Sequence, residues 1–150
     1  MPIIDISREL TATAPYAGDP PPRMHALATH EQDGYQLQAV VMSLHAATHA
    51  DAPLHFLPGG SDVAALPLDA FVGPCTVLTA PAGALDAAFF LRSAFGAAAP
   101  APHGERLLLR GPGYLLKSAI GYLYTRGVRL VGTDQPSVGR PEDERTAHRA

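Results

Sequence analysis

Three histidines and one aspartate fall within eleven residues of this sequence, at His45, His49, Asp51 and His55. Imidazole nitrogens and carboxylate oxygens are the donors that a borderline divalent cation such as zinc prefers. A neutral surface segment does not need so many of these groups at such short spacing. The segment therefore predicts a metal site, with zinc as the first expectation and manganese as the alternative.

The spacing of these groups restricts the backbone between them. In an extended strand His45 and His49 would stand roughly 13 Å apart, whereas ligands lie only about 2.0–2.2 Å from their ion. Either a helix places the two histidines one turn apart, or a strand ends near His45 and the chain curls back. Pro53 and Thr48 favour the curl, because a residue before proline is driven out of the helical region. We expect a strand that runs into a tight loop.

The segment 45–55 resembles the signature of the cyclase and kynurenine formamidase family of metal-dependent hydrolases, written His-x-Gly-Thr-His-x-Asp-x-Pro-x-His. Ala47 stands where the signature has glycine. A glycine there would serve a backbone with positive φ or a close approach, so alanine adds strain or alters the loop. Two further stretches are similar to the same family: residues 16–20, as aromatic-x-Gly-Asp-Pro, and residues 132–137, as Gly-x-Asp-x-Pro-Ser.

The resemblance implies a set of metal ligands. In the family, the residues that match His45, His49 and Asp51 hold one metal, and the aspartate bridges to a second. His148 falls where a ligand of the second metal is expected. The resemblance therefore implies one or two ions per chain.

The resemblance also implies a reaction. His55 matches the family's proton donor and acceptor, and an imidazole with a pKa near 6.5 transfers protons at neutral pH. A metal lowers the pKa of its water from 15.7 toward about 7, so we expect metal-bound hydroxide to attack a carbonyl while His55 protonates the leaving nitrogen. Tyr16, which the family places over the substrate, and Phe56 would offer an aromatic wall. Such a site suits an aryl formamide, for example N-formylkynurenine from tryptophan catabolism, or an isatin-like lactam.

The family continues past the position of His148 to a glutamate that bridges both metals, and this sequence stops at Ala150. We therefore expect a shortened member whose second metal site is weak or empty, unless Glu142, Glu144 or a partner subunit supplies the ligand. Three ligands remain at the first site, the number typical of catalytic zinc. Two alternatives to a hydrolase remain open: an inactive member that binds a metal or small molecule, and an oligomer-dependent structural or regulatory subunit.

Composition describes the surroundings of the site. With 150 residues, 47% of them hydrophobic, the chain is expected to form one domain, residues 1–150, with its own core. A net charge of −3 gives no reason to expect nucleic acid or an anionic membrane as a partner. The lone Cys75 and the lack of a signal peptide or long apolar run predict a soluble cytoplasmic protein. We expect a small-molecule substrate and a homodimer or higher homo-oligomer.

The elements that position the site are expected to form a mixed α/β (α+β) fold, which the resemblance narrows to a layered β/β/α swivelling domain. Asp33-Gly34 is a hairpin signal, and the alternating segment that follows it ends at His45, so the metal loop would hang from a sheet. Asp134 is expected to cap its own turn. Strands are expected at 3–6, 24–29, 35–44, 75–79, 106–110 and 128–131, helices at 84–95 and 114–126, and surface histidines at positions 25, 30 and 103.

Overall fold

The structure, a computed structural model, describes residues 3–93, 106–140 and 142–150. The chain divides into two compact units, Met1–Asp51 and Ala52–Ala150. His45, His49 and Asp51 close the first unit, whereas His55 belongs to the second.

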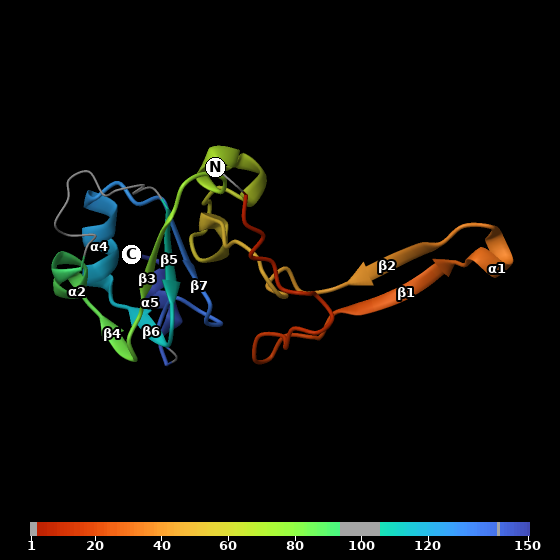
Figure 1. The fold of residues 1–150 in the computed structure, drawn as a ribbon, viewed down its shortest axis with the longest axis horizontal. Coiled ribbons are helices and arrows are strands. Elements are labelled where there is room, and N and C mark those ends of the chain that lie inside the picture. The colour runs from red at the N-terminus through yellow and green to blue at the C-terminus, as the bar shows by residue number, and fades with distance from the viewer. Residues whose placement is uncertain (1–2, 94–105, 141) are drawn as a thin grey trace. The chain divides into compact units, whose positions relative to one another are not determined.

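A β-hairpin is the regular part of the first unit. β1 (Arg23–Ala28) pairs antiparallel with β2 (Leu37–Val41), with Met24 opposite Val40. The helical turn α1 (His30–Asp33) joins the two strands at the tip of the hairpin (Figure 1). The predicted hairpin is confirmed, and β2 ends four residues before His45.

The connection of the hairpin differs from a two-residue turn at Asp33-Gly34. The Thr29 hydroxyl accepts a hydrogen bond from the Gln32 N–H, and the Asp33 carboxylate accepts one from the Thr29 N–H at 2.9 Å. These reciprocal bonds cap the start of α1, and Gly34 ends it with a φ of +76°. Local side-chain hydrogen bonds therefore favour a turn of helix at this position.

The strand predicted at residues 3–6 is wrong. The structure gives this segment no regular secondary structure, and Ile3, Ile4 and Ile6 are exposed. Alternating apolar residues form a strand only where a neighbouring strand satisfies their backbone groups, and no described strand pairs with this segment.

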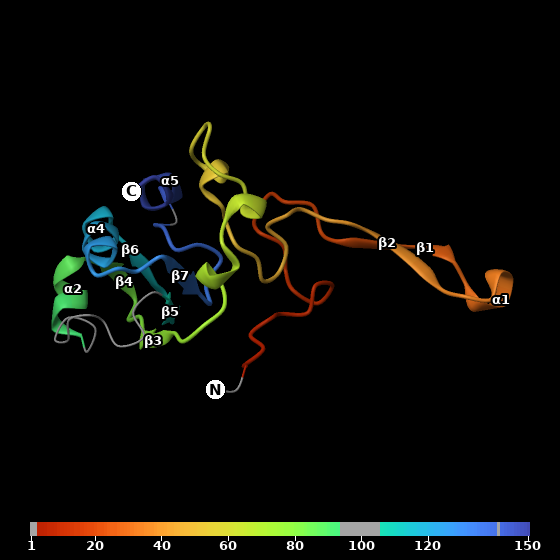
Figure 2. The same cartoon turned by 90° about the horizontal axis from the view of Figure 1, so that it is seen from above.

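The described residues of the second unit form two parallel sheets and three α-helices. The larger sheet has the order β3-β5-β7, and a smaller sheet pairs β4 with β6. Helices α2 and α4 lie side by side next to the larger sheet (Figures 1 and 2). The bounds are β3 (Thr76–Thr79), β4 (Gly83–Leu85), α2 (Ala87–Arg92), β5 (Arg106–Arg110), β6 (Gly113–Leu115), α4 (Lys117–Thr125), β7 (Leu130–Thr133) and α5 (Glu144–His148).

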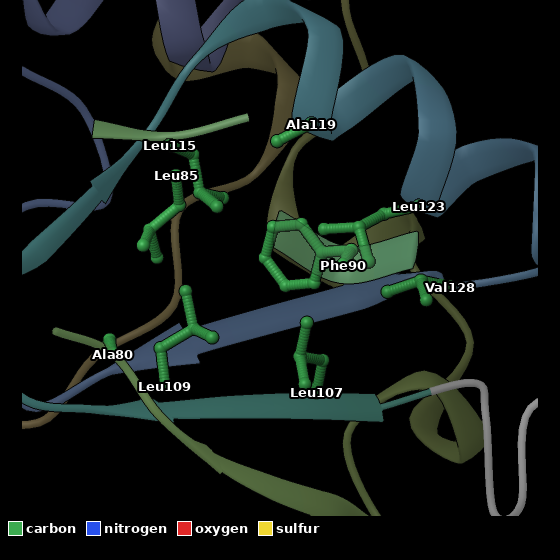
Figure 3. Close-up of a cluster of buried hydrophobic side chains, with 9 residues drawn as sticks. All are labelled: Ala80, Leu85, Phe90, Leu107, Leu109, Leu115, Ala119, Leu123 and Val128. Carbon is green, nitrogen blue, oxygen red and sulfur yellow. The ribbon is translucent and has the colours of Figure 1, made fainter. Parts of the chain in front are cut away.

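The hydrophobic core of the second unit lies between β5, the smaller sheet and the two helices (Figure 3). Leu107 and Leu109 share the face of β5 that points toward Phe90, because side chains alternate along a strand. Phe90 of α2 and Leu123 of α4 are fully buried beside them. Each such side chain contributes about 1.5–3 kcal/mol to folding. Sheet, smaller sheet and helices form the expected layers, and the mixed α/β class is confirmed.

Predicted boundaries were less accurate than predicted elements. The strands at 75–79 and 106–110 are confirmed, while the last strand lies at Leu130–Thr133, two residues later than expected. The helices at 84–95 and 114–126 begin late, because β4 and β6 occupy their first residues and pair with each other. The predicted end of the first helix and His103 lie outside the described residues.

A polar clamp closes the turn that follows β7. The Asp134 carboxylate accepts hydrogen bonds from the Gly111 N–H at 3.0 Å and from the Gln135 side chain at 2.9 Å. Gly111 has a φ of +123°. It passes so close to Ala80 that a Cβ added at Gly111 would stand 2.4 Å from the carbonyl oxygen of Ala80. Asp134 thus makes structural contacts, as expected, but the backbone N–H that it binds belongs to the turn after β5 rather than to its own turn. Among the described helices, none has the length and apolar character needed to span a membrane.

Candidate metal centre

The side chains of His45, His49 and Asp51 converge on one point. His45 Nδ1 lies 3.1 Å from Asp51 Oδ1 and 3.3 Å from His49 Nε2. His49 Nε2 lies 3.7 Å from the same carboxylate oxygen. The three side chains are between 27% and 32% exposed.

This triangle fits a divalent cation. Ligands at about 2.0–2.2 Å from a tetrahedral ion lie roughly 3.3–3.6 Å from one another. The three observed separations, 3.1, 3.3 and 3.7 Å, bracket that range to within a few tenths of an ångström. Two neutral imidazoles and one carboxylate are also a common donor set for catalytic zinc. The donors could hold an ion and leave one position open.

The tautomer of His49 suits a metal ligand. Its Nδ1 lies 3.0 Å from the Ala47 carbonyl oxygen, which can only accept a hydrogen bond. Nδ1 therefore carries the proton, and the lone pair of a neutral ring is on Nε2, the atom that faces His45 and Asp51. Metal-bound histidines usually donate their second ring N–H to such a partner, which fixes the ring orientation.

A tight loop brings the three donors together. Beyond Val41 the chain forms turns and bends rather than a helix, which confirms the predicted curl. Ala47 has a φ of +52° and is the one non-glycine residue with positive φ among the described residues. Alanine in this conformation costs about 1–2 kcal/mol. The expectation that position 47 calls for positive φ is confirmed, and the strained residue supplies the carbonyl that orients His49.

Residues from the beginning of the chain brace this loop. The Arg8 N–H donates to the Thr48 hydroxyl at 2.9 Å. The Ser43 hydroxyl donates to Asp19 Oδ2 at 2.5 Å and accepts a bond from the His45 N–H at 3.2 Å. Sequence reasoning missed Ser43 and the contact of Asp19. The one available signal was that Asp19 belongs to the Gly-Asp-Pro stretch similar to the family.

Tyr16, the predicted substrate-binding aromatic, lies in the first unit and is half-buried. Its carbonyl accepts a hydrogen bond from the Asp19 N–H at 2.9 Å, which closes the turn around Gly18. Its role toward a substrate stays a prediction.

The second unit brings three other predicted site residues together. The rings of Phe56 and His148 stack with centroids 4.4 Å apart, and the His55 centroid lies 4.1 Å from Phe56 and 6.3 Å from His148. His148 Nε2 also lies 3.4 Å from the Ser137 hydroxyl. Long-range folding thus places the end of α5 against the 3₁₀ turn Pro53–His55. The assignments of His55 to proton transfer and of His148 to a second metal stay predictions.

The remaining candidates occupy ordinary positions. His25 and His30 are exposed, as expected for surface histidines. Glu142, considered as a replacement ligand, accepts a hydrogen bond from Arg140 at 2.8 Å on an exposed surface. The side chain of Glu144 lies outside what the structure describes.

Comparison with known proteins shows how this arrangement is related to others. The Cyclase family model, described as "Putative cyclase", matches residues 4–140. The chain belongs to the cyclase family. This result confirms the resemblance, and the matched range contains the complete loop from His45 to His55.

A sequence relative and two solved structures define the similarity further. The chain is 42% identical over 109 residues to a kynurenine formamidase of Paracidovorax citrulli, and the match covers 71% of this chain and 50% of the relative. A potential metal-dependent hydrolase with cyclase activity has a TM-score of 0.74 at 21% identity, with 97% of this chain and 74% of that chain covered. Isatin hydrolase A from Labrenzia aggregata, bound to benzyl benzoate, has a TM-score of 0.73 at 19% identity over the same shares. The two structures show the shared fold, and the chain spans half the length of the formamidase.

Proposed function

We propose that this cyclase-family chain holds a divalent metal ion through His45, His49 and Asp51 and hydrolyses an aryl formamide or a cyclic amide. The observation that carries the proposal is the triangle of donor atoms, with sides of 3.1, 3.3 and 3.7 Å. Zinc is the proposed ion, because two imidazoles and a carboxylate suit its preferred coordination, and manganese is the second choice.

Each residue of the proposed site has a separate role in the reaction. When bound, the ion supplies Lewis acidity and makes hydroxide available near neutral pH. The Nε2 lone pair of His49 is available to the ion because the Nδ1 N–H donates a hydrogen bond to the Ala47 carbonyl oxygen. Asp51 contributes the negative charge of the donor set. His55, four residues further along the chain, donates a proton to the leaving nitrogen, as its match to the family signature suggests.

The substrate class is proposed from chemistry and from the relatives. An aniline nitrogen leaves more readily than an alkyl amine, so an aryl formamide is a favourable substrate for a weakly enclosed site. The sequence relative is a kynurenine formamidase, which supports N-formylkynurenine. A structural neighbour is an isatin hydrolase, which supports isatin as the cyclic alternative. Tyr16 and Phe56 are proposed to contact the aromatic ring of either substrate.

The test combines metal analysis with two substrates. Chelator-stripped protein is loaded with zinc or manganese, the bound ions are counted, and hydrolysis of N-formylkynurenine and isatin is measured. We expect at least one ion per chain and turnover of one of the substrates. His49→Ala should lose the ion and lower kcat/KM by more than about 10³-fold, the scale expected when the machinery of a step is removed. The matched control, His30→Ala, removes an exposed imidazole of the same unit and should leave both quantities unchanged.

Three outcomes would contradict the proposal. Wild-type protein that binds neither ion removes the metal from the mechanism. Wild-type activity in His49→Ala has the same consequence. Protein that binds an ion but hydrolyses neither these compounds nor a panel of other formamides, lactams and esters is an inactive binding member instead.

We further propose that the chain works as a homo-oligomer, at least a dimer. The hairpin of β1 and β2 leaves Leu27 64% and Val41 62% exposed, and a two-stranded hairpin is only marginally stable by itself in water. Light scattering after size exclusion should give a mass of at least two chains, and a monomer would contradict this proposal.

A cytoplasmic location is proposed from the single Cys75, which leaves no internal pair for a disulfide.

A further inference from the structure

We propose that Asp19 is a positioning residue that holds the metal ligand His45 in place through the hydroxyl group of Ser43. The inference rests on the proposed metal site and adds a residue to it. Asp19 does not belong to the His45–His55 signature, and it acts through Ser43 rather than as a donor to the ion.

The two hydrogen bonds fix the direction of the Ser43 hydroxyl. Ser43 has one hydroxyl proton, and the Asp19 carboxylate can only accept it, over 2.5 Å. The oxygen of the same hydroxyl is then left to accept the His45 N–H at 3.2 Å. The Ser43 carbonyl also accepts the Ala46 N–H at 3.1 Å. Ser43 thus accepts hydrogen bonds from two consecutive backbone N–H groups, those of His45 and Ala46.

The bond from Ser43 to Asp19 is of the strong kind. A hydroxyl that donates to a charged carboxylate over about 2.5–2.7 Å makes a hydrogen bond roughly twice as strong as a neutral one. It is partly buried and joins residues 24 positions apart in the sequence. Asp19 is itself held, because its N–H donates to the Tyr16 carbonyl at 2.9 Å. The contact therefore ties one fixed turn to another.

A metal site depends on such support. Functional side chains must stay within about 0.5 Å of their productive geometry, and loops need outer hydrogen bonds to achieve this. His45 lies beyond the end of β2, so the sheet does not fix its backbone directly. Asp19 and Ser43 supply that restraint, in the way that outer residues commonly orient a ligand and set its affinity.

The experiment measures zinc affinity by competition with a chromophoric chelator. We expect Asp19→Ala and Ser43→Ala each to weaken zinc binding by about 10- to 100-fold, the usual effect of removing an outer-shell partner. The double variant should lose no more than the larger single loss, because both residues act through one contact. Ser43→Thr, which retains the hydroxyl, should recover most of the affinity, whereas Asp19→Asn, which keeps an acceptor but loses the charge, should recover only part of it.

A matched control and a metal-free measurement complete the test. Asp5→Ala removes a carboxylate of the same unit that accepts hydrogen bonds from Ser7, with the Ser7 N–H at 2.9 Å, and should leave zinc affinity unchanged. In metal-free protein, hydrogen exchange of the His45 amide should become faster in Asp19→Ala and Ser43→Ala but not in Asp5→Ala. This measurement does not depend on zinc binding.

The results separate two failures. Wild-type protein that binds no zinc overturns the proposed function, and the amide exchange of His45 then decides whether Asp19 still positions the loop. Wild-type protein that binds zinc, together with an unchanged affinity in Asp19→Ala, overturns the positioning role alone. Additive losses in the double variant would also contradict a shared path through Ser43.

Discussion

The two units of this chain are stabilised by different interactions. Ala28 and Ala46 are the only buried hydrophobic residues among the described residues of the first unit. The second unit has a buried hydrophobic cluster that includes Phe90 and Leu107. The first unit instead relies on hairpin pairing, turns and side-chain hydrogen bonds. The complete candidate metal triangle lies in the unit with almost no core.

This difference has a consequence for the metal site. Loops that bind ligands come from the less stable parts of proteins, and polar contacts at a surface contribute less than a packed core. The donors at His45, His49 and Asp51 therefore depend on the loop contacts and on the ion itself. The core of the second unit should unfold independently of changes at the triangle.

Phe90→Ala tests the contribution of the core. The side chain is fully buried, and removing it should lower the free energy of unfolding by about 3–5 kcal/mol. Urea unfolding monitored in the second unit measures this loss. Leu91→Ala is the matched control, because Leu91 is the next residue of α2 and is 60% exposed. Equal losses in the two variants would show that the packing around Phe90 does not carry the stability.

Zinc should stabilise the first unit selectively. At a free concentration one hundred times its Kd, a ligand that binds only the folded state adds about 2.7 kcal/mol. Hydrogen exchange should therefore slow between Val41 and Asp51 when zinc is added, with little change in β5. Asp51→Asn should abolish the protection. Equal protection in both units would mean that the ion stabilises the chain as a whole.

The sequence was most informative where the determinants are local. His45, His49 and Asp51 lie within seven residues, so ligand distances and the proline effect were enough to predict a curl. The pairing of β4 with β6 joins two three-residue strands nearly thirty residues apart, and such short segments carry no detectable period. The sequence therefore predicts helix over the last two residues of each strand, 84–85 and 114–115.

The contact between Asp19 and Ser43 could not be predicted for the same reason. An aspartate in a Gly-Asp-Pro stretch is typical of a turn, and Ser43 falls within the strand predicted at 35–44, so neither pattern indicates a contact between them. Only the folded chain shows that the two side chains meet. Local spacing therefore revealed the donors, while the residues that support them required tertiary structure.

Ala47→Gly tests the strain in the metal loop. Alanine at a φ of +52° is disfavoured, and glycine adopts this conformation freely. Relief of strain should outweigh the greater entropy of the unfolded chain and raise the stability of the first unit by about 0.5–1 kcal/mol. Hydrogen exchange of the loop amides measures the change, with Ala50→Gly as a nearby control. Faster exchange in Ala47→Gly would show that alanine fits the loop without strain.

The smallest predicted effect concerns the turn at Glu9, again in the first unit. The Thr11 hydroxyl donates to the Glu9 carboxylate at 2.7 Å, and this bond, followed by the Thr11 and Ala12 N–H groups, lowers the pKa of Glu9. Because the folded pKa is depressed, the stabilising contribution is present above the ordinary glutamate pKa and is lost as pH falls through the folded value.

The Glu9 prediction is tested by NMR titration. Thr11→Ala removes the largest cause and should raise the pKa of Glu9 toward its ordinary value, while the backbone bonds keep it partly lowered. The pKa of Asp5, which is lowered mainly by the Ser7 N–H, should not change. The carboxylate is fully exposed, so solvent screens the interaction and the core around Phe90 should not respond. An unchanged Glu9 titration in Thr11→Ala would show that the two N–H groups alone organise this turn. It would also contradict the claim that side-chain hydrogen bonds stabilise this part of the first unit.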